Sequence, residues 1–456
     1  MTILTVDFGS TFTKGALIAD DGTVLGTAST PTTGVRGGGD ILDGYRTLRA
    51  ELEVPDDATV RACSSAGGGL RLAVVGYERT VTAQAGHRVG LSAGAKVVHV
   101  AGGELTTADV AGVRASRPDI ILLVGGTDGG NRNVLLHNAA RLAKGAIGGH
   151  GAHAVPVVVA GNVEVRDEAV AILETAGRPT VLADNVLPQI GVIAPESARA
   201  AIRDVFLRHV IGGKGLSRDP AFAAMVEAAT PDVVLRGVEV LASVTDGDVL
   251  VVDVGGATTD VYSCLTPGGE DATLRKDVVA PLWHARTVEG DLGLRWNAEH
   301  VIEAASAEHL LDTVADPAAL TAYAARVHER PGSLPVDDVE RGQDLELARL
   351  AALVAVRRHA RAAQPTESAR PLADVRVLVG SGGVLRHADA IGRDHVLGAI
   401  LADHAGGWKV PRAARATVDT AYLLFAAGLL AIPDATTSDT RAQPDLARTV
   451  ATQTLP

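Results

Sequence analysis

Cysteine, aromatic residues and long hydrophobic runs are all scarce in this sequence of 456 residues. The two cysteines, Cys63 and Cys264, give neither a disulfide framework nor a CxxC metal pair, so we expect a reducing, cytoplasmic setting. With only 5 Phe, 5 Tyr and 3 Trp, the core must be built from Val, Leu, Ile and Ala, as in parallel-sheet α/β proteins. The longest apolar run, at 421–432, is shorter than the roughly 20 residues of a membrane-spanning helix, and the N-terminus lacks the features of a signal peptide.

Basic side chains are outnumbered: 42 Lys and Arg stand against 54 Asp and Glu, and the net charge is −12. This acidic balance argues against binding to nucleic acid or to a membrane surface. Hydrophobic residues make up 46% and charged residues 21% of the chain, which excludes a wholly disordered protein. At roughly 100–200 residues per domain, the length predicts several folding units and allows a large cleft between lobes.

Strand and helix patterns alternate through the middle of the chain. Apolar runs predict strands at 96–101, 119–124, 155–160 and 179–182, separated by predicted helices at 107–117, 133–144 and 166–176. Such βαβ units predict a buried parallel sheet. A long helix is expected at 343–363, and the polar C-terminal tail is expected to be frayed.

An internal repeat is the most informative feature of the sequence. Residues 3–30 predict three short strands, and the first turn lies in VDFGSTFTK at 6–14. The segment VDVGGATTD at 252–260 repeats this pattern 246 residues further along. Each copy has an apolar strand ending in aspartate, a glycine-rich turn and hydroxyl residues that begin the next strand.

The chemistry of this pattern fits phosphate binding. Glycine lets the backbone N–H groups approach an anion closely, and Ser and Thr add small donors. An aspartate beside a polyphosphate calls for Mg²⁺, commonly with its own waters, between the two. The alternative is two ordinary hairpins that use Asp and Gly as turn formers; the second matching copy argues against it.

A third glycine-rich segment completes the set. The predicted strand VRVLV at 375–379 is followed by Gly380, Ser381, Gly382 and Gly383 and then by a helix pattern, an arrangement that suits the sugar and first phosphate of a nucleotide. The segment LLVGGTDGGN at 122–131 has the same pattern within the central α/β layer, where it is either a ligand or partner loop or a strand-to-helix turn.

The order of these motifs resembles the superfamily of actin, heat-shock chaperone ATPases and sugar kinases, whose two lobes hold ATP and Mg²⁺ in a cleft. Five segments together resemble the glutamate mutase component L family, whose members accompany adenosylcobalamin-dependent mutases as ATP-driven reactivating chaperones. These segments are VDFGSTFTKGALI, CSSAGGGLRLAVVG (63–76), PDIILLVGGTDGGN (118–131), VVDVGGATTDV (251–261) and RTVEGDLGLRWNA (286–298). The resemblance covers roughly residues 1–435.

The resemblance implies an α/β protein with a two-lobed actin-like ATPase fold and an inserted parallel α/β layer. The expected parts are the start of the first nucleotide lobe (1–80), the inserted subdomain (81–190), a return to the first lobe with connecting helices (191–247), the start of the second lobe (248–264), a mostly helical insertion (265–374), the end of the second lobe (375–435) and a polar tail (436–456).

Site residues follow from the same resemblance, position by position. The first phosphate hairpin would contain Asp7, Gly9, Ser10, Thr11, Thr13 and Lys14; the second would contain Asp253, Gly255, Gly256, Thr258 and Thr259. Asp7 and Asp253 would hold hydrated Mg²⁺, and Gly380, Ser381, Gly382 and Gly383 would contact the adenosine. Lys14 either neutralises a phosphate oxygen or is a surface charge. Glu289 and Gly290 resemble a helix-opening segment that approaches the nucleotide, although an acidic helix start is also a common cap.

ATP hydrolysis needs a group that positions the attacking water, and Asp7, Asp253 and Asp260 are the candidates. The resemblance implies the subunits of an adenosylcobalamin-dependent mutase as partners and leaves room for a homo-oligomer. The 81–190 layer is the expected contact region for the mutase. A small-molecule kinase or another ATP-dependent enzyme on the same fold is the alternative function, followed by a scaffold that no longer hydrolyses ATP.

Overall fold

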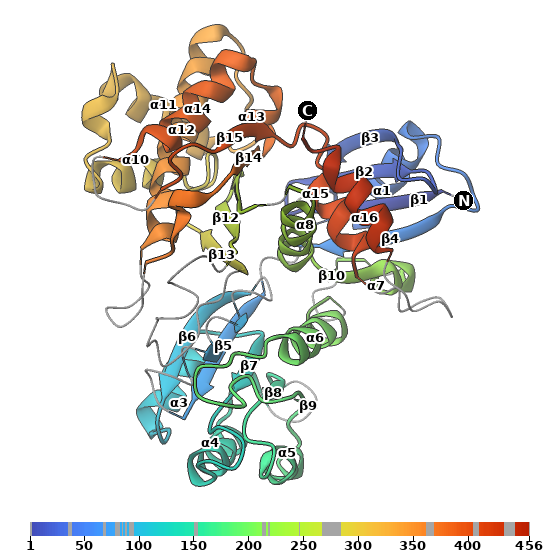
Figure 1. Ribbon diagram of the computed structural model, residues 1–456, viewed down its shortest axis with the longest axis vertical. Coiled ribbons are helices and arrows are strands. Elements are labelled where there is room, and N and C mark those ends of the chain that lie inside the picture. The colour runs from blue at the N-terminus through green and yellow to red at the C-terminus, as the bar shows by residue number, and fades with distance from the viewer. Residues whose placement is uncertain are drawn as a thin grey trace. The chain divides into compact units, whose positions relative to one another are not determined.

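A computed structural model of the chain describes residues 2–34, 39–66, 70–77, 83, 85–86, 89–90, 95–149, 154–211, 216–217, 219–245, 247–266, 284–361, 369–404, 410–432 and 443–455. The chain divides into two compact units. Figure 1 labels the helices and strands. Unit 1 comprises Met1–Ile18, Ala28–Val234 and Pro267–Ala285, and unit 2 comprises Ala19–Thr27, Leu235–Thr266 and Arg286–Pro456. The expected mixed α/β class with parallel strands is confirmed.

The first five-stranded sheet, sheet I, has the order β10-β4-β1-β2-β3. Its central strand β1 is antiparallel to β2 and parallel to β4, which is in turn parallel to β10. The strand bounds are β1 Ile3–Phe8, β2 Phe12–Ile18, β3 Val24–Pro31, β4 Thr59–Ser64 and β10 Val226–Ala229. The three strands expected in residues 3–30 are thus confirmed.

The second five-stranded sheet, sheet II, has the order β13-β12-β11-β14-β15 and repeats this arrangement. Its central strand β11 is antiparallel to β12 and parallel to β14, which is parallel to β15. The bounds are β11 Val249–Val254, β12 Thr259–Cys264, β13 His284–Glu289, β14 Val377–Ser381 and β15 Arg415–Val418. Since β1 and β11 hold the same place in the two sheets, the sequence repeat is also a repeat of the fold.

The third sheet, sheet III, is parallel throughout and has the order β6-β5-β7-β8-β9. Its strands and adjoining helices are β5 Arg71–Gly76, β6 Lys96–Gly102, α3 Thr107–Ala115, β7 Ile120–Leu123, α4 Asn133–Lys144, β8 Val157–Val159, α5 Arg166–Thr175, β9 Thr180–Leu182 and α6 Glu196–Val205. Strand β5 precedes the boundary expected at residue 80, yet its buried run RLAVVG lies between β6 and β7 and pairs with both.

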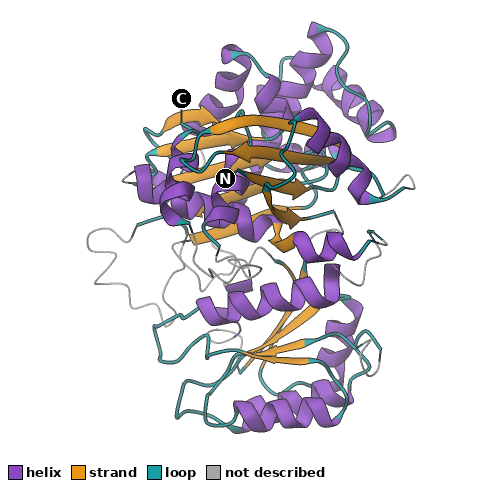
Figure 2. Cartoon of the chain, turned by 90° about the vertical axis from the view of Figure 1, so that its right-hand side faces the viewer, coloured by secondary structure: helices purple, strands orange, loops and turns teal. Residues whose placement is uncertain are grey.

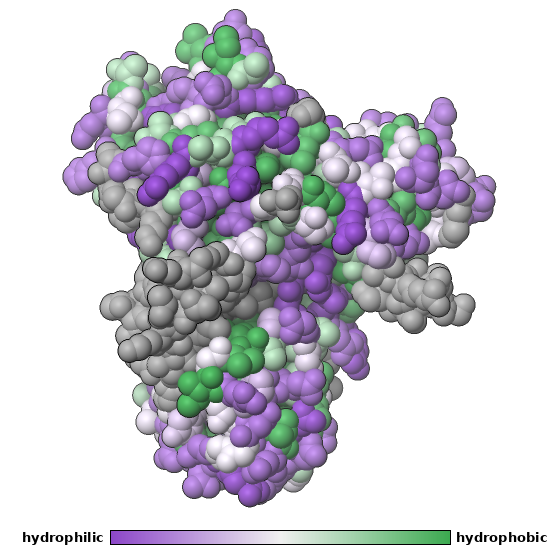
Figure 3. Space-filling view, in the orientation of Figure 1, coloured by the Kyte–Doolittle hydropathy of each residue, from purple (hydrophilic) through white to green (hydrophobic). Residues whose placement is uncertain are grey.

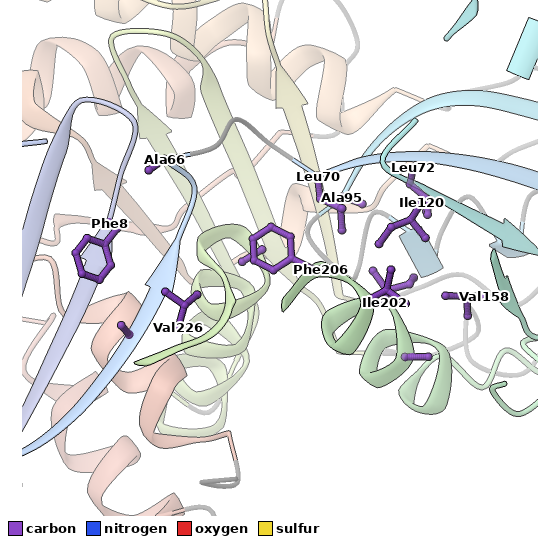
Figure 4. Close-up of a cluster of buried hydrophobic side chains, with 14 of the residues drawn as sticks. Phe8, Ala66, Leu70, Leu72, Ala95, Ile120, Val158, Ile202, Phe206 and Val226 are labelled. Carbon is purple, nitrogen blue, oxygen red and sulfur yellow. The ribbon is translucent and has the colours of Figure 1, made fainter. Parts of the chain in front are cut away.

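Alternate residues of sheet III face two different cores. On one face, Leu72, Ile120 and Val158 belong to a cluster with Ile202 of α6 that also includes Phe8 of β1 (Figure 4). On the opposite face, the neighbouring strand residues join side chains of α4 and α5 in a second cluster. Helices consequently lie on both sides of this sheet (Figure 2), and its strands are continuous apolar runs.

Several helices complete the chain. They are α1 Ile41–Glu51, α7 Pro220–Met225, α8 Thr230–Thr245, α10 Ala298–Ala307, α11 Pro317–Glu329, α12 Asp338–Ala360, α13 Gly383–His387, α14 Ala390–Ala402, α15 Leu423–Leu430 and α16 Pro444–Thr452. The long helix expected from residue 343 begins earlier, at Asp338, because the side chain of Asp337 accepts the N–H of Glu340 and caps it.

The tail expected to be frayed instead carries α16. Ala447, Val450 and Ala451 share the buried side of this helix, and Gln453 just beyond it donates to the carbonyl oxygen of Gly22 at 2.8 Å. Residues 433–442 lie outside the described part.

Within the described residues, no helix is long and apolar enough to cross a membrane. Hydrophilic residues predominate among those coloured in Figure 3.

A buried histidine makes the stability of unit 2 depend on pH. His359 of α12 is fully buried, and its ring nitrogens lie 2.9 Å from the hydroxyls of Ser263 and Thr287. Burial, assisted by the charge of Arg370, lowers the pKa of His359 well below its ordinary value. The unfolded chain therefore binds a proton more readily, and stability is present above about pH 6.5 and declines below it by up to about 1.4 kcal/mol per pH unit.

We expect the free energy of unfolding, measured by urea denaturation, to fall between pH 7.5 and pH 5.5, and His359→Gln to flatten this dependence. His300→Gln, which changes an exposed histidine, is the control and should keep the wild-type slope. An unchanged slope in His359→Gln would show that other groups cause the dependence.

Candidate functional site

The first glycine-rich turn joins β1 to β2. Gly9 donates its N–H to the carbonyl oxygen of Phe12 at 3.1 Å, and a Cβ at position 9 would lie 2.6 Å from that oxygen. The turn therefore requires glycine at its first position. Ser10 and Thr11 are exposed at its tip, as phosphate binding requires.

The carbonyl side of this turn is held by Thr32. The hydroxyl of Thr32 donates to the carbonyl oxygen of Gly9 at 2.9 Å. The backbone N–H of Thr32 donates to the carbonyl oxygen of Thr11, also at 2.9 Å. Thr13 is buried, and its hydroxyl lies 3.1 Å from that of Thr32. Thr13 thus supports the turn from behind and is not part of the exposed tip.

Asp7 lies at the carboxyl end of β1 with three polar neighbours from other elements. Its Oδ1 accepts hydrogen bonds from the hydroxyl of Thr230 at 2.5 Å and from the thiol of Cys63 at 3.6 Å, and its Oδ2 lies 3.9 Å from Nζ of Lys14. Burial raises the pKa of Asp7, against the opposing effects of Lys14, Thr230 and Cys63. Burial and then the charge of Asp7 raise the pKa of Cys63 well above its ordinary value, which agrees with its role as a hydrogen-bond donor to Asp7.

We expect Thr230→Val to lower the free energy of unfolding by about 1–2 kcal/mol. The reason is that the buried carboxylate of Asp7 would lose the hydrogen bond from the Thr230 hydroxyl, and valine has a similar shape but no donor. Chemical denaturation measures the loss. Thr230→Ser keeps the hydroxyl and serves as the control, with a stability near that of the wild type. Equal losses in both variants would mean that the methyl group, and not the hydrogen bond, is what stabilises this position.

The second glycine-rich turn joins β11 to β12 and repeats the first. Gly255 donates its N–H to the carbonyl oxygen of Thr258 at 2.9 Å, and a Cβ at position 255 would lie 2.8 Å from that oxygen. Thr259 corresponds to Thr13 in the repeat and is also buried, with its hydroxyl donating to the carbonyl oxygen of Leu292 at 2.6 Å. This threonine is again part of the support behind the turn.

Two carboxylates face each other across the second hairpin. Asp253 is opposite Asp260 in the antiparallel register, a like-charge pair that is unfavourable without compensation. The buried guanidinium of Arg286 compensates it by donating to Oδ1 of Asp260 at 2.7 Å. The hydroxyl of Thr258 lies 3.1 Å from Oδ2, so both oxygens of Asp260 are in use. The first hairpin differs, since Lys14 stands opposite Asp7.

Both turns keep backbone N–H groups available. In the described part of the chain, the N–H groups of Ser10, Thr11, Gly256 and Ala257 have no hydrogen-bond partner in the protein, whereas the neighbouring carbonyl oxygens are occupied. A turn with its carbonyl side blocked and its N–H side open suits an anion.

The third glycine-rich segment lies at the end of β14. Ser381 is opposite Asp253 in the parallel register, so the carboxyl ends of β11 and β14 meet at the same edge of sheet II. Gly382 has φ +101°, and a Cβ there would lie 2.2 Å from the carbonyl oxygen of Val254. At Gly383, the first residue of α13, a Cβ would meet nothing within 4 Å.

Within unit 2, these segments bring most of the predicted residues together at one edge of sheet II. They are Asp253, Gly255, Gly256, Thr258, Gly380, Ser381, Gly382 and Gly383. Within unit 1, Asp7, Gly9, Ser10, Thr11 and Lys14 gather at the corresponding edge of sheet I.

Glu289 and Gly290 do not open a helix, contrary to the sequence-based interpretation. Glu289 ends β13, and α10 begins only at Ala298. Arg358 of α12 donates to Glu289 and Asp291, both at 2.8 Å, so these acids neutralise an arginine. Burial raises the pKa of Glu289, with Arg358 acting in the opposite direction.

The segment 124–131 follows β7 as an irregular loop and not as a tight turn. Asn162 and Asn185 hold it by donating to the carbonyl oxygens of Gly130 and Gly126 at 3.3 and 3.0 Å. Gly126 and Gly129 have positive φ values of +69° and +73°.

Sequence reasoning missed Thr230, Arg286 and Arg295, three residues whose contacts join distant segments. Thr230 follows β10 and reaches Asp7 only because β10, β4 and β1 are adjacent parallel strands. Arg286 and Arg295 lie in the segment 286–298, which resembles the family. No local sequence pattern links either arginine to the second turn. The order of the strands would have placed Thr230 near Asp7 and Arg286 beside Asp260, but it gives no signal for Arg295.

Comparison with known proteins identifies the family. A family model described as MutL protein matches residues 3–443. The chain belongs to this family. A curated member, "Protein MutL" of Clostridium tetanomorphum, is 36% identical over 460 residues, which cover 94% of this chain and 96% of the relative. The expected resemblance to the glutamate mutase component L family is thereby confirmed.

Solved structures resemble the chain more distantly. A ROK family glucokinase from Streptomyces griseus in complex with glucose and AMPPNP has a TM-score of 0.32 and 11% identity, covering 99% of both chains. Component A of the (R)-2-hydroxyglutaryl-CoA dehydratase of Acidaminococcus fermentans has a TM-score of 0.29 and 8% identity, covering both chains fully at 100%. Nucleotide-free acetone carboxylase has a TM-score of 0.39 and 14% identity, covering 94% of this chain and 70% of its own. TM-scores this low carry no conclusion about function.

Proposed function

We propose that this chain binds and hydrolyses ATP and thereby reactivates an adenosylcobalamin-dependent mutase of the glutamate mutase type. The observation that supports this best is the duplicated sheet, because sheets I and II each place an aspartate and a glycine-closed turn at the end of their central strand. Membership of the MutL family supports the choice of client.

In this proposal each turn binds phosphate through its backbone N–H groups. The N–H groups of residues 10–11 and 256–257 donate to phosphate oxygens, together with the exposed hydroxyls of Ser10 and Thr11. Lys14 lowers the negative potential around Asp7. Gly383 leaves room for the adenosine beside the end of β14, and Gly382 lets the chain pass close to Val254.

Asp253 suits a hydrated Mg²⁺ better than Asp7 does. Asp253 is partly exposed, whereas Asp7 is buried, and a hydrated ion needs an accessible carboxylate. Among the described residues, no three His, Cys, Asp or Glu side chains gather as a metal site. In this proposal the ion enters bound to the nucleotide. When bound, Mg²⁺ neutralises phosphate charge.

The attacking water would be positioned by Asp7 or Asp253. Asp260 suits this task less, because Arg286 and Thr258 occupy its two oxygens. Asp260 instead orders Thr258 at the second turn.

The client is a mutase that holds a damaged cofactor. A chaperone shifts such a mutase toward its open form only by binding that form more tightly, and ATP turnover would switch this preference. The α/β layer built on sheet III is the proposed contact region, because it adds to the repeated sheets.

Mixing inactivated mutase with this chain, adenosylcobalamin and Mg-ATP tests the proposal. We expect mutase turnover to recover with ATP and not with a non-hydrolysable analogue, and phosphate to be released without any added acceptor. Failure to recover turnover in every combination would contradict the reactivase role. Strict dependence of phosphate release on a small-molecule acceptor would instead indicate a kinase.

A further inference from the structure

The second turn is held from behind by the segment that follows β13. The N–H groups of Leu294 and Arg295 donate to the carbonyl oxygens of Gly255 and Gly256 at 3.1 and 2.9 Å. The N–H of Trp296 also donates to the carbonyl oxygen of Gly256, at 3.0 Å. The side-chain amide of Asn297 donates to the carbonyl oxygen of Ala257 at 2.8 Å. The carbonyl oxygens of Gly255, Gly256 and Ala257 therefore each accept from residues 294–297.

This backing segment is itself fixed by the side chain of Arg295. Its guanidinium donates two hydrogen bonds, each 2.7 Å long, to the two oxygens of Asp344 in α12. The hydroxyl of Tyr323 in α11 donates to the same carboxylate at 2.8 Å, and Nε of Arg295 donates to the carbonyl oxygen of Ser333 at 3.1 Å. Arg295 and Asp344 are nearly buried, with side chains 12% and 8% exposed. Such a forked pair is rigid and cannot be replaced by a single-point cation.

We propose that Arg295 is a positioning residue for the second phosphate turn. By tying residues 294–297 to α12, it holds the carbonyl groups of Gly255 and Gly256 in place and so fixes the direction of the N–H groups at Gly256 and Ala257. This inference rests on the proposed ATP binding, because the N–H groups are useful only to an anion. Arg295 acts through the turn, and its own guanidinium is committed to Asp344 and Ser333.

In the described part of the chain, the first turn is backed by Thr32, which donates one hydroxyl and one N–H, and no buried arginine–carboxylate fork holds this backing residue. The two halves of the repeat therefore differ in stiffness: the second turn is preorganised through Arg295, and the first is held by hydrogen bonds among neutral groups.

A second arginine fork in the same helix provides a matched control. Arg357 of α12 donates two hydrogen bonds of 2.7 Å to Asp403, and both side chains are 9% exposed. Its hydrogen bonds in the described part of the chain go to Asp403 and Glu308. Arg357→Lys and Arg295→Lys therefore disrupt the same kind of buried pair. Only Arg295→Lys alters the segment that is hydrogen-bonded to Gly256.

The test compares the wild type, Arg295→Lys, Asp344→Asn and Arg357→Lys. Titration with Mg-ATP should show an affinity at least about tenfold weaker for Arg295→Lys and Asp344→Asn, with Arg357→Lys within about twofold of the wild type. Hydrogen exchange of the peptide containing residues 252–260, measured without nucleotide, should accelerate in the first two variants only. Thermal unfolding shows whether each variant is folded.

Two results would overturn the inference. One is wild-type exchange of the 252–260 peptide in Arg295→Lys, and the other is an equal loss of affinity in Arg295→Lys and Arg357→Lys. If the wild type itself fails to bind Mg-ATP, the proposed function is wrong, while the exchange measurement still decides whether Arg295 fixes the turn.

Discussion

Asp253→Asn is expected to lower the rate of ATP hydrolysis on the order of 100-fold while leaving the fold intact. The side chain is partly exposed at the end of β11, so an amide of the same shape fits the site. The amide lacks the charge that would hold a hydrated Mg²⁺ at the phosphates and that would orient water. It also relieves the like-charge pair with Asp260, so stability should be unchanged or slightly higher.

Phosphate release under saturating Mg-ATP measures this effect, with Asp248→Asn as the control. Asp248 precedes the same strand at its other end, where its carboxylate accepts the N–H of Thr266. The control should hydrolyse ATP at nearly the wild-type rate. If Asp253→Asn hydrolysed ATP at the wild-type rate, the carboxylate of Asp253 would have no role in hydrolysis.

Gly382→Ala is expected to destabilise the protein by about 3 kcal/mol, because the position combines backbone strain with a steric clash. Its φ of +101° disfavours any residue with a Cβ. The added Cβ would lie 2.2 Å from the carbonyl oxygen of Val254, which is a backbone atom and cannot rotate away. Relief of the clash would shift the end of β11 and with it the second turn. Urea denaturation measures the loss, and ATP affinity should fall in parallel.

Gly383→Ala is the matched control one residue further along. A Cβ there meets nothing within 4 Å, so the free energy of unfolding should stay within about 0.5 kcal/mol of the wild type. The new methyl group would occupy space proposed for the adenosine, so Mg-ATP should bind this folded variant about tenfold more weakly. If Gly382→Ala were as stable as Gly383→Ala, the close approach of Gly382 to Val254 would not constrain the protein.

The local elements were predictable because their signals are local. Continuous apolar runs marked the strands of sheet III, and the repeated V-D-x-G pattern marked both hairpins. The start of α12 was misplaced because the capping side chain of Asp337 lies before the apolar periodicity begins. The tail helix α16 was missed because its buried face consists of alanine and valine within a polar segment.

The finer features of the site depend on which side of a strand each residue faces and on distant partners. Thr13 and Thr259 were predicted at the phosphates, yet both are buried behind their turns. Since side chains alternate along a strand, a single position decides between the two sides. The contacts of Thr230 with Asp7 and of Arg295 with Asp344 join residues from different helices and strands, and spacing along the chain does not encode them.

The central claim is that the glycine-rich turns bind ATP, and calorimetric titration with a non-hydrolysable Mg-ATP analogue tests it most directly. The wild type should bind the analogue, and Asp7→Asn and Asp253→Asn should each weaken its binding. Binding of wild-type strength in both variants would contradict this claim.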